Sequence, residues 1–174
     1  MTEIRLPLLR STYCSRCNIR APRSTGIKLA EKYLKRGGKF LDYGCSTWRN
    51  SSYLQQVLEM DNIRVDISPE SKPNVVAYPT ALPFRSKSID VVALTHVLMF
   101  LMNWEELINA LKELDRISRD LGVVEMYHVK KANSLEFKNE DVLDLLTNSF
   151  SILAKVVRKD MLNVVVRVKD IIKQ

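Results

Sequence analysis

The chain has 174 residues, a length that suits one compact domain with a hydrophobic core. Hydrophobic residues make up 46% and charged residues 27%, which excludes a disordered or collagen-like chain. The formal net charge of +7 is a moderate basic bias, and the longest apolar stretches fall far short of a membrane span.

The first 24 residues form a basic N-terminal segment, and we expect the folded domain to occupy residues 25–174. The segment carries five arginines against the single acidic residue Glu3. Such a charge pattern suits a polyanion such as RNA, or else a solvated tail, and the segment either stays mobile or covers the site. Arg10 is among the charges that interrupt the apolar residues at the start of the chain, so we expect a cytoplasmic protein rather than a secreted one.

Three cysteines, of which Cys14 and Cys17 form one CxxC pair, are too few for a disulfide framework. A structural zinc ion needs four ligands. With no second pair, and with His96 and His128 as the sole histidines, we predict no metal site.

Hydrophobic periodicity beyond the basic segment predicts alternating helices and strands. The first helix begins at Ser24 or Thr25 and ends at Gly37-Gly38, and the second begins at Asn50 or Ser51. Asn103 and Glu106 have the spacing of a capping box that opens a third helix, and a fourth spans about 139–148. Strands are expected at 39–43, 63–66, 75–76, 89–94, 121–127, 150–157 and 162–169.

This order of elements predicts an α/β fold with helices on both faces of a mostly parallel sheet. The last two strands are joined by a short turn near Lys159-Asp160, which predicts a C-terminal antiparallel hairpin. In such sheets ligands bind beyond the carboxyl ends of the strands, where the strand order reverses. The loops that follow the first five strands are therefore the candidate site.

Two carboxylates and a glycine stand at those strand ends. Gly44 follows the strand that contains Asp42, so backbone can approach a ligand closely there. Asp66 ends the second strand, a position from which a carboxylate can bind both hydroxyls of a ribose. A nucleoside cofactor is indicated, whereas Ser46 and Arg49 stand where the dinucleotide fingerprint requires further glycines.

At this point the chain resembles the class I, Rossmann-like methyltransferases, in particular the group with a leucine-proline-phenylalanine signature. Residues 41–45 (LDYGC) look like the first motif of that family and residues 65–69 (VDISP) like the second. Residues 81–92 (ALPFRSKSIDVV) are similar to the stretch that leads into its fourth strand, and residues 95–98 (THVL) to the loop that follows. The resemblance implies a seven-stranded sheet with its last strand reversed, and S-adenosylmethionine as the methyl donor.

Carried over by position, the resemblance assigns the cofactor-binding residues. Those facing the methionine part would be Gly44, Cys45 and Ser46, with Asp42 steadying the turn and Thr95 beside the methionine end. Asp66 and Ile67 would meet the ribose. The adenine would be bordered by Tyr78, Ala81 and Leu82. The family usually has glycine where this chain has Ser46 and Trp48, and often an acidic residue where it has Tyr78, so the motif departs from the family at three places.

Methyl transfer from a sulfonium depends largely on alignment, so a dedicated base is optional. His96 is the best-placed candidate base, but filling the wall beside the cofactor is its more ordinary role, and we assign no catalytic residue. The acceptor could be RNA, a small molecule or a protein, and residues 81–86 also weakly resemble methyltransferases that act on tRNA wobble uridines. The alternative to an enzyme is a catalytically inactive methyltransferase-like binding or scaffold module, which the departures at Ser46, Trp48 and Tyr78 favour.

Overall fold

A computed structural model of the chain describes residues 22, 24–46, 48–127 and 137–169. The helices are α1 (Thr25–Ala30), α2 (Arg49–Leu58), α3 (Trp104–Ile117) and α4 (Asn139–Ser149), with short 3-10 turns η1 (Glu31–Tyr33), η2 (Pro69–Ser71) and η3 (Leu98–Phe100). The strands are β1 (Lys39–Tyr43), β2 (Asp61–Asp66), β3 (Val75–Val76), β4 (Ile89–Thr95), β5 (Ser118–Tyr127), β6 (Phe150–Arg158) and β7 (Met161–Val168). The CxxC pair, His128 and most of the basic N-terminal segment lie outside the described residues.

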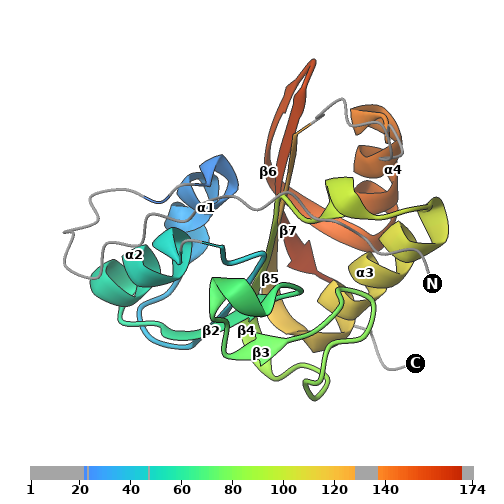
Figure 1. Cartoon of the computed structure of the whole chain (residues 1–174). Coiled ribbons are helices and arrows are strands. Elements are labelled where there is room, and N and C mark those ends of the chain that lie inside the picture. Colours follow the sequence, from blue (N-terminus) through green and yellow to red (C-terminus); the bar gives the residue numbers. More distant parts are fainter. Residues whose placement is uncertain (1–21, 23, 47, 128–136, 170–174) are drawn as a thin grey trace, which may run out of the picture.

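All seven strands form one sheet in the order β3-β2-β1-β4-β5-β7-β6 (Figure 1). The strands β1 to β5 pair with one another in parallel, while β7 runs antiparallel to both β5 and β6. The predicted mostly parallel sheet with a C-terminal antiparallel hairpin is thus confirmed. The order of strands reverses between β1 and β4, whose connections leave in opposite directions. In sheets of this kind ligands bind beyond the carboxyl ends of the strands at this point.

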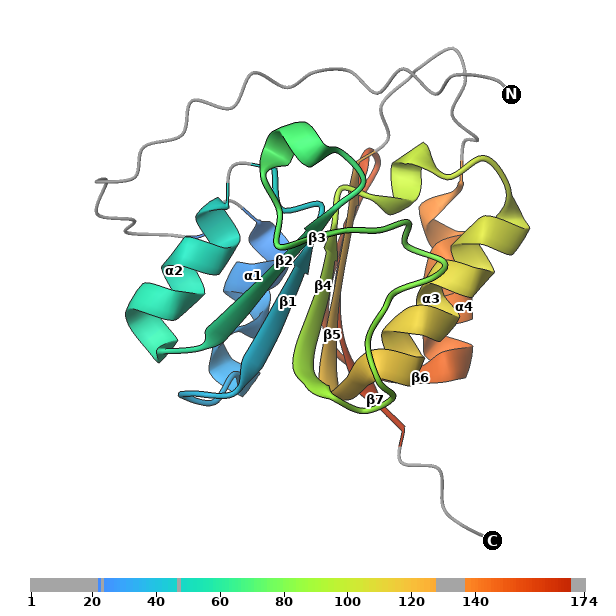
Figure 2. The ribbon, with the colours of Figure 1, turned by 60° about the horizontal axis from the view of Figure 1, so that its bottom comes forward.

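Helices cover the sheet on both faces: α1 and α2 lie on one, α3 and α4 on the other (Figure 2). The larger core cluster joins α3 and α4 to the sheet through residues such as Leu111 and Leu146, and the smaller one joins α1 and α2 through Ile27 and Leu54. Every residue of β4 except Asp90 is buried, because a central parallel strand is covered on both faces. No helix in the described part of the chain has the length and apolar character needed to cross a membrane.

Polar side chains fix the starts of the helices. Ser24 accepts a hydrogen bond from Ile27 N and caps α1, as predicted, although α1 ends at Ala30 and continues only as the 3-10 turn η1. Asn103 caps α3 by accepting from Glu106 N, but the Glu106 carboxylate accepts from Met102 N and not from Asn103 N. The predicted capping box is therefore formed in one of its two bonds.

The start of α2 differs from the prediction. Its N-cap residue is Trp48, in a left-handed conformation and without a side-chain cap, rather than Asn50 or Ser51. The capping oxygen comes from the neighbouring strand: Asp42 Oδ2 accepts from Ser51 N at 3.2 Å and from Ser51 Oγ at 2.6 Å. A tertiary contact from β1 thus replaces the local cap. The sequence around the start of the helix does not reveal such a contact.

Candidate cofactor site

The loop after β1 passes very close to the end of β4. Gly44 has φ +79°, in the left-handed region that favours glycine. A Cβ at Gly44 would stand 2.6 Å from Val97 Cγ2 and 2.8 Å from the carbonyl oxygen of Thr95, closer than atoms can pack. The absence of a side chain therefore lets β1 and β4 approach at the switch point, where the sequence predicted the cofactor.

Asp66 joins the loops that follow β1 and β2. Its side chain is 8% exposed. Oδ2 accepts from Ser46 N at 3.2 Å and lies 4.0 Å from Cys45 Sγ, while Oδ1 accepts from Ser68 N at 3.0 Å. Because a carboxylate has about four acceptor positions, Asp66 keeps capacity for a further donor, and its position at a strand end suits a ribose hydroxyl.

Asp42 serves the structure of the turn. It is fully buried, one oxygen caps α2, and Oδ1 has no hydrogen-bond partner. Burial raises the pKa of this carboxyl to about 6, partly offset by the hydrogen bonds from Ser51. Cys45 is also buried, and burial raises the pKa of its thiol, so it stays protonated and is a poor nucleophile.

The two residues that depart from glycine in the first motif adopt backbone conformations that glycine favours. Ser46 has φ +38° and Trp48 φ +59°, so both occupy left-handed conformations. The Trp48 indole donates to Ser71 O at 2.7 Å, and the Arg64 guanidinium stacks 3.9 Å from its ring centre. Trp48 therefore ties the loop to β2 and η2, and one face of its ring is already covered by a cation.

The predicted adenine border is spread along α3. Tyr78 donates to Glu106 Oε2 at 3.2 Å, near the start of α3 and the strand ends. Leu82 N donates to Glu113 at 2.8 Å, seven residues further along the helix, which corresponds to a rise of about 10 Å. Leu82 is buried and Ala81 exposed. The structure thus gathers Gly44, Cys45, Ser46, Asp66, Ile67 and Thr95 at the strand ends, leaves Tyr78 near them, and places Leu82 deeper against α3.

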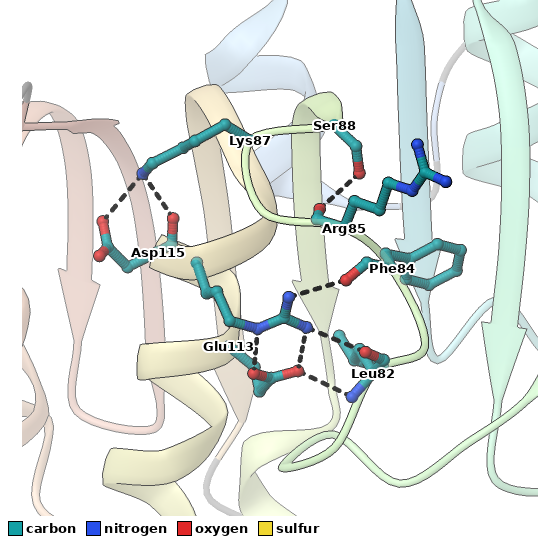
Figure 3. A network of polar contacts seen from close by, with 8 residues as sticks. Leu82, Phe84, Arg85, Lys87, Ser88, Glu113 and Asp115 are labelled. Atoms are coloured by element: carbon teal, nitrogen blue, oxygen red, sulfur yellow. Dashed lines mark hydrogen bonds and ion pairs between the residues drawn. The ribbon is translucent and has the colours of Figure 1, made fainter.

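A network of ion pairs and hydrogen bonds holds the segment that contains Leu82 and Phe84 (Figure 3). The Arg116 guanidinium donates to Leu82 O at 2.9 Å and to Phe84 O at 2.7 Å, and it pairs with Glu113. Lys87 bonds to Asp115 at the end of the same segment. The leucine-proline-phenylalanine stretch is therefore fixed to α3, and its role in the fold is to hold the connection from β3 to β4.

Sequence reasoning singled out His96 but missed its partner Glu125 at the end of β5. His96, which follows Thr95, has its Nε2 2.8 Å from Oε1 of the buried Glu125. Glu125 stands inside the apolar run 121–127, and a charged residue within such a run is the signal that points to it. A separate hollow lies between α3 and α4, away from the strand ends. It is lined by Trp104, Ile108, Asp141, Asp144, Leu145 and Asn148.

The chemistry of the residues at the strand ends suits a nucleoside cofactor. Gly44 brings β1 against the end of β4, and Asp66 has acceptor positions to spare for a ribose hydroxyl. The described residues contain no group of three or more metal-ligating side chains.

Comparisons with known proteins agree with this geometry. Residues 41–126, from β1 to β5, match the family model described as "Methyltransferase domain". Comparison with curated proteins finds no match.

Solved structures of the same fold include methyltransferases of three bacteria. A SAM-dependent methyltransferase from Aquifex aeolicus is 15% identical (TM-score 0.65) over 83% of this chain and 90% of that one. A TehB-like SAM-dependent methyltransferase from Corynebacterium glutamicum is 18% identical (TM-score 0.66) over 83% and 87%. Magnesium protoporphyrin IX methyltransferase from Synechocystis, solved with bound SAM, is 17% identical (TM-score 0.64) over 83% and 76%. The chain therefore contains a methyltransferase domain at residues 41–126. Its fold is that of solved S-adenosylmethionine-dependent methyltransferases.

Proposed function

We propose that the chain binds S-adenosylmethionine across the carboxyl ends of β1, β2 and β4 and transfers its methyl group to an acceptor. The observation that carries the proposal is the close approach of Gly44 to Thr95 beside Asp66, at the point where the strand order reverses. Asp66 would bind the ribose, the backbone of Gly44 to Ser46 would face the methionine part, and Tyr78 would border the adenine.

The sulfonium of the cofactor supplies an already activated methyl group. The contribution of this chain is then to orient both reactants and to exclude water. Asp66 and the loop after β1 are fixed to each other by the hydrogen bond from Ser46 N, so the ribose position is held before binding. Thr95, buried at the end of β4, forms the boundary between the cofactor and the acceptor sides.

Calorimetric titration tests the cofactor proposal. We expect micromolar affinity for S-adenosylmethionine and for its demethylated product, a free energy on the order of −7 to −8 kcal/mol. Asp66→Ala should weaken this binding by about 1.5–3 kcal/mol, the range for hydrogen bonds to a charged group. Asp61→Ala is the matched control, since Asp61 is an exposed carboxylate at the opposite end of β2 and should leave affinity unchanged.

A second candidate function is a binding or scaffold module without catalysis. It is favoured by the way the loop after β1 binds its own partners: Ser46 N donates to Asp66, and the Trp48 ring covers Arg64. No binding of either nucleoside by the wild-type chain at millimolar concentration would establish this alternative. Equal binding by wild type and the folded Asp66→Ala variant would instead remove Asp66 from the site.

For the methyl acceptor we propose RNA, supported by the five arginines of the basic N-terminal segment. Most of that segment lies outside the described residues, so the support is its charge alone. Ser24, its last residue, is buried and caps α1, which connects the segment directly to the folded domain.

A further inference from the structure

Glu125 is a buried carboxylate that accepts hydrogen bonds through Oε2, while Oε1 lies beside the His96 ring without a bond of regular geometry. It is 1% exposed on β5, in a strand whose neighbouring residues are apolar. Oε2 accepts from Ser24 Oγ at 2.7 Å and from Gly26 N at 2.6 Å, and Oε1 lies 2.8 Å from His96 Nε2. Burial alone would raise the pKa of this carboxyl, but the hydrogen bonds from His96, Gly26 and Ser24 outweigh it and lower the pKa.

The close packing of α1 on this carboxylate is built into the sequence. A Cβ at Gly26 would stand 2.8 Å from Val123 Cγ1 and 3.2 Å from Glu125 Oε2, so a side chain there would push α1 off the sheet. The start of α1 thus approaches Glu125 closely enough for Ser24 and Gly26 to donate to it. The two hydrogen bonds from the start of α1 therefore fix the position of the Glu125 carboxylate.

His96 is presented to solvent by the same arrangement. Its backbone has φ +59°, its N–H donates to Glu125 O at 2.9 Å, and its ring stacks on Tyr127 with the centres 4.7 Å apart. The side chain is 33% exposed although three contacts hold it. A carboxylate beside Nε2 favours the tautomer with its hydrogen on Nε2, which leaves the lone pair on Nδ1. Within the described part of the chain no residue bonds to Nδ1.

The imidazole and the cofactor residues lie on opposite sides of the switch point. His96 directly follows Thr95, whose carbonyl is the atom that a Cβ on Gly44 would strike. Asp66 stands at the end of β2, on the outer side of β1, whereas Glu125 stands on β5, on the outer side of β4. A ligand bound over β1 and β2 therefore has the imidazole beside its β4 end.

A third polar side chain faces the same side of the sheet. Asn163 on β7 is the cross-strand partner of Glu125, is fully buried, and has no hydrogen-bond partner for either amide atom. Side chains paired in this way have Cβ atoms about 4.5–5.5 Å apart. A buried amide without partners points to a polar group that completes it, such as a water or part of a ligand.

We propose that His96 Nδ1 accepts the proton of the methyl acceptor, that Glu125 positions the imidazole, and that the acceptor is a neutral hydroxyl or amine. The assignment rests on the proposed methyl transfer. The acceptor's oxygen or nitrogen forms a bond to the methyl carbon, the sulfur–methyl bond breaks with its electron pair remaining on sulfur, and the acceptor proton moves to Nδ1. The imidazolium so formed is stabilised by the Glu125 carboxylate at 2.8 Å.

The tautomer of His96 is the first test, and it needs no acceptor. In a His128→Gln background His96 is the sole imidazole, so its ring nitrogens can be observed by ¹⁵N NMR in protein saturated with S-adenosylhomocysteine. We expect hydrogen on Nε2 and a lone pair on Nδ1, and a mixture of both tautomers in Glu125→Gln. Hydrogen on Nδ1 in the parent protein, or a folded Glu125→Gln variant with an unchanged tautomer, would overturn the proposal. If Glu125→Gln does not fold, the parent spectrum decides.

Chemical modification tests whether Nδ1 is reachable from the acceptor side. Diethyl pyrocarbonate acylates unprotonated imidazole nitrogen, and mass spectrometry should locate the modification on His96 in the His128→Gln protein. S-adenosylmethionine affinity, measured by calorimetry, should change less than twofold after modification. An unreactive His96 overturns the proposal, and so does a modification that abolishes cofactor binding, since it would place His96 in the cofactor site. If the unmodified protein does not bind the cofactor, the proposed function is refuted instead. The NMR and modification results then still report the tautomer and the reactivity of His96.

The class of acceptor is tested with phenol and aniline as probes. Each is titrated at tens of millimolar into the protein saturated with S-adenosylhomocysteine while the His96 nitrogen signals are followed. A shift with phenol assigns a hydroxyl acceptor, and a shift with aniline assigns an amine. No shift with either probe overturns the assignment of the acceptor class.

Discussion

The approach of the loop after β1 to β4 makes a quantitative prediction for Gly44→Ala. An alanine at φ +79° has a left-handed strain of about 1–2 kcal/mol, of which about 0.4–1 kcal/mol is offset by the reduced entropy of the unfolded chain. Its Cβ would also meet Val97 Cγ2 at 2.6 Å and Thr95 O at 2.8 Å. The oxygen belongs to the backbone of a buried strand and cannot move aside cheaply, which adds about 1–3 kcal/mol. We expect a total loss of about 2–4 kcal/mol.

Gly37→Ala is the matched control for this prediction. Gly37 has φ +73°, nearly the conformation of Gly44, but a Cβ there would meet no atom within 4 Å. It should therefore lose only the backbone strain, about 1 kcal/mol. Urea unfolding measures the two free energies, and a difference of 2 kcal/mol corresponds to about 4–8 °C in melting temperature for a chain of this size. Equal losses in the two variants would refute the close approach of β1 and β4.

Three further predictions concern other parts of the molecule. The pKa of Asp42 is raised to about 6 in the folded state, so the folded protein binds more protons than the unfolded chain between about pH 4 and 6, and its stability falls as the pH rises through that range. The unfolding free energy of Asp42→Asn, measured with urea, should therefore rise by about 2 kcal/mol relative to wild type between pH 4 and 7.5. Parallel pH profiles of the two proteins would contradict this. Arg116→Lys should lower the unfolding free energy by about 1–2 kcal/mol and speed trypsin cleavage after Arg85. The reason is that lysine cannot donate to Leu82 O and Phe84 O at once, as the planar guanidinium does. An unchanged rate of cleavage would argue against Arg116 holding this segment to α3. A chain beginning at Pro22, which keeps the cap Ser24, should retain cofactor affinity but lose salt-dependent binding of a single-stranded RNA oligonucleotide; binding that survives truncation would leave a small molecule or protein as the acceptor.

Much of the fold could be predicted because its signals are local. Alternation of apolar runs and helical periods placed all seven strands, and the turn at Lys159-Asp160 identified the hairpin that reverses β7. The sheet rule then located the candidate site at the strand ends without any side-chain information. The boundaries were less accurate where a tertiary contact decides them, as at α2, whose cap comes from Asp42 on β1.

The polar pair at the ends of β4 and β5 could not be found in this way. Glu125 bonds to Ser24, 101 residues earlier in the chain, and lies beside His96, which directly follows the neighbouring strand β4. No periodicity relates these positions, since their contact is created by the sheet order and by the packing of α1. The sequence shows that a charged residue, Glu125, stands inside an apolar strand, but it does not show that Ser24 and His96 lie beside it.

The departures from glycine in the first motif show what a glycine pattern encodes. A family that has glycine at the positions of Ser46 and Trp48 can adopt left-handed backbone there without strain. This chain adopts left-handed backbone at both positions, with φ +38° and +59°, at a strain of about 1 kcal/mol or more for each residue. Its side chains and backbone supply the compensation: Ser46 N donates to Asp66, and Trp48 bonds to Ser71 and stacks on Arg64. In this chain tertiary contacts, rather than glycine, maintain the left-handed conformation of the loop after β1.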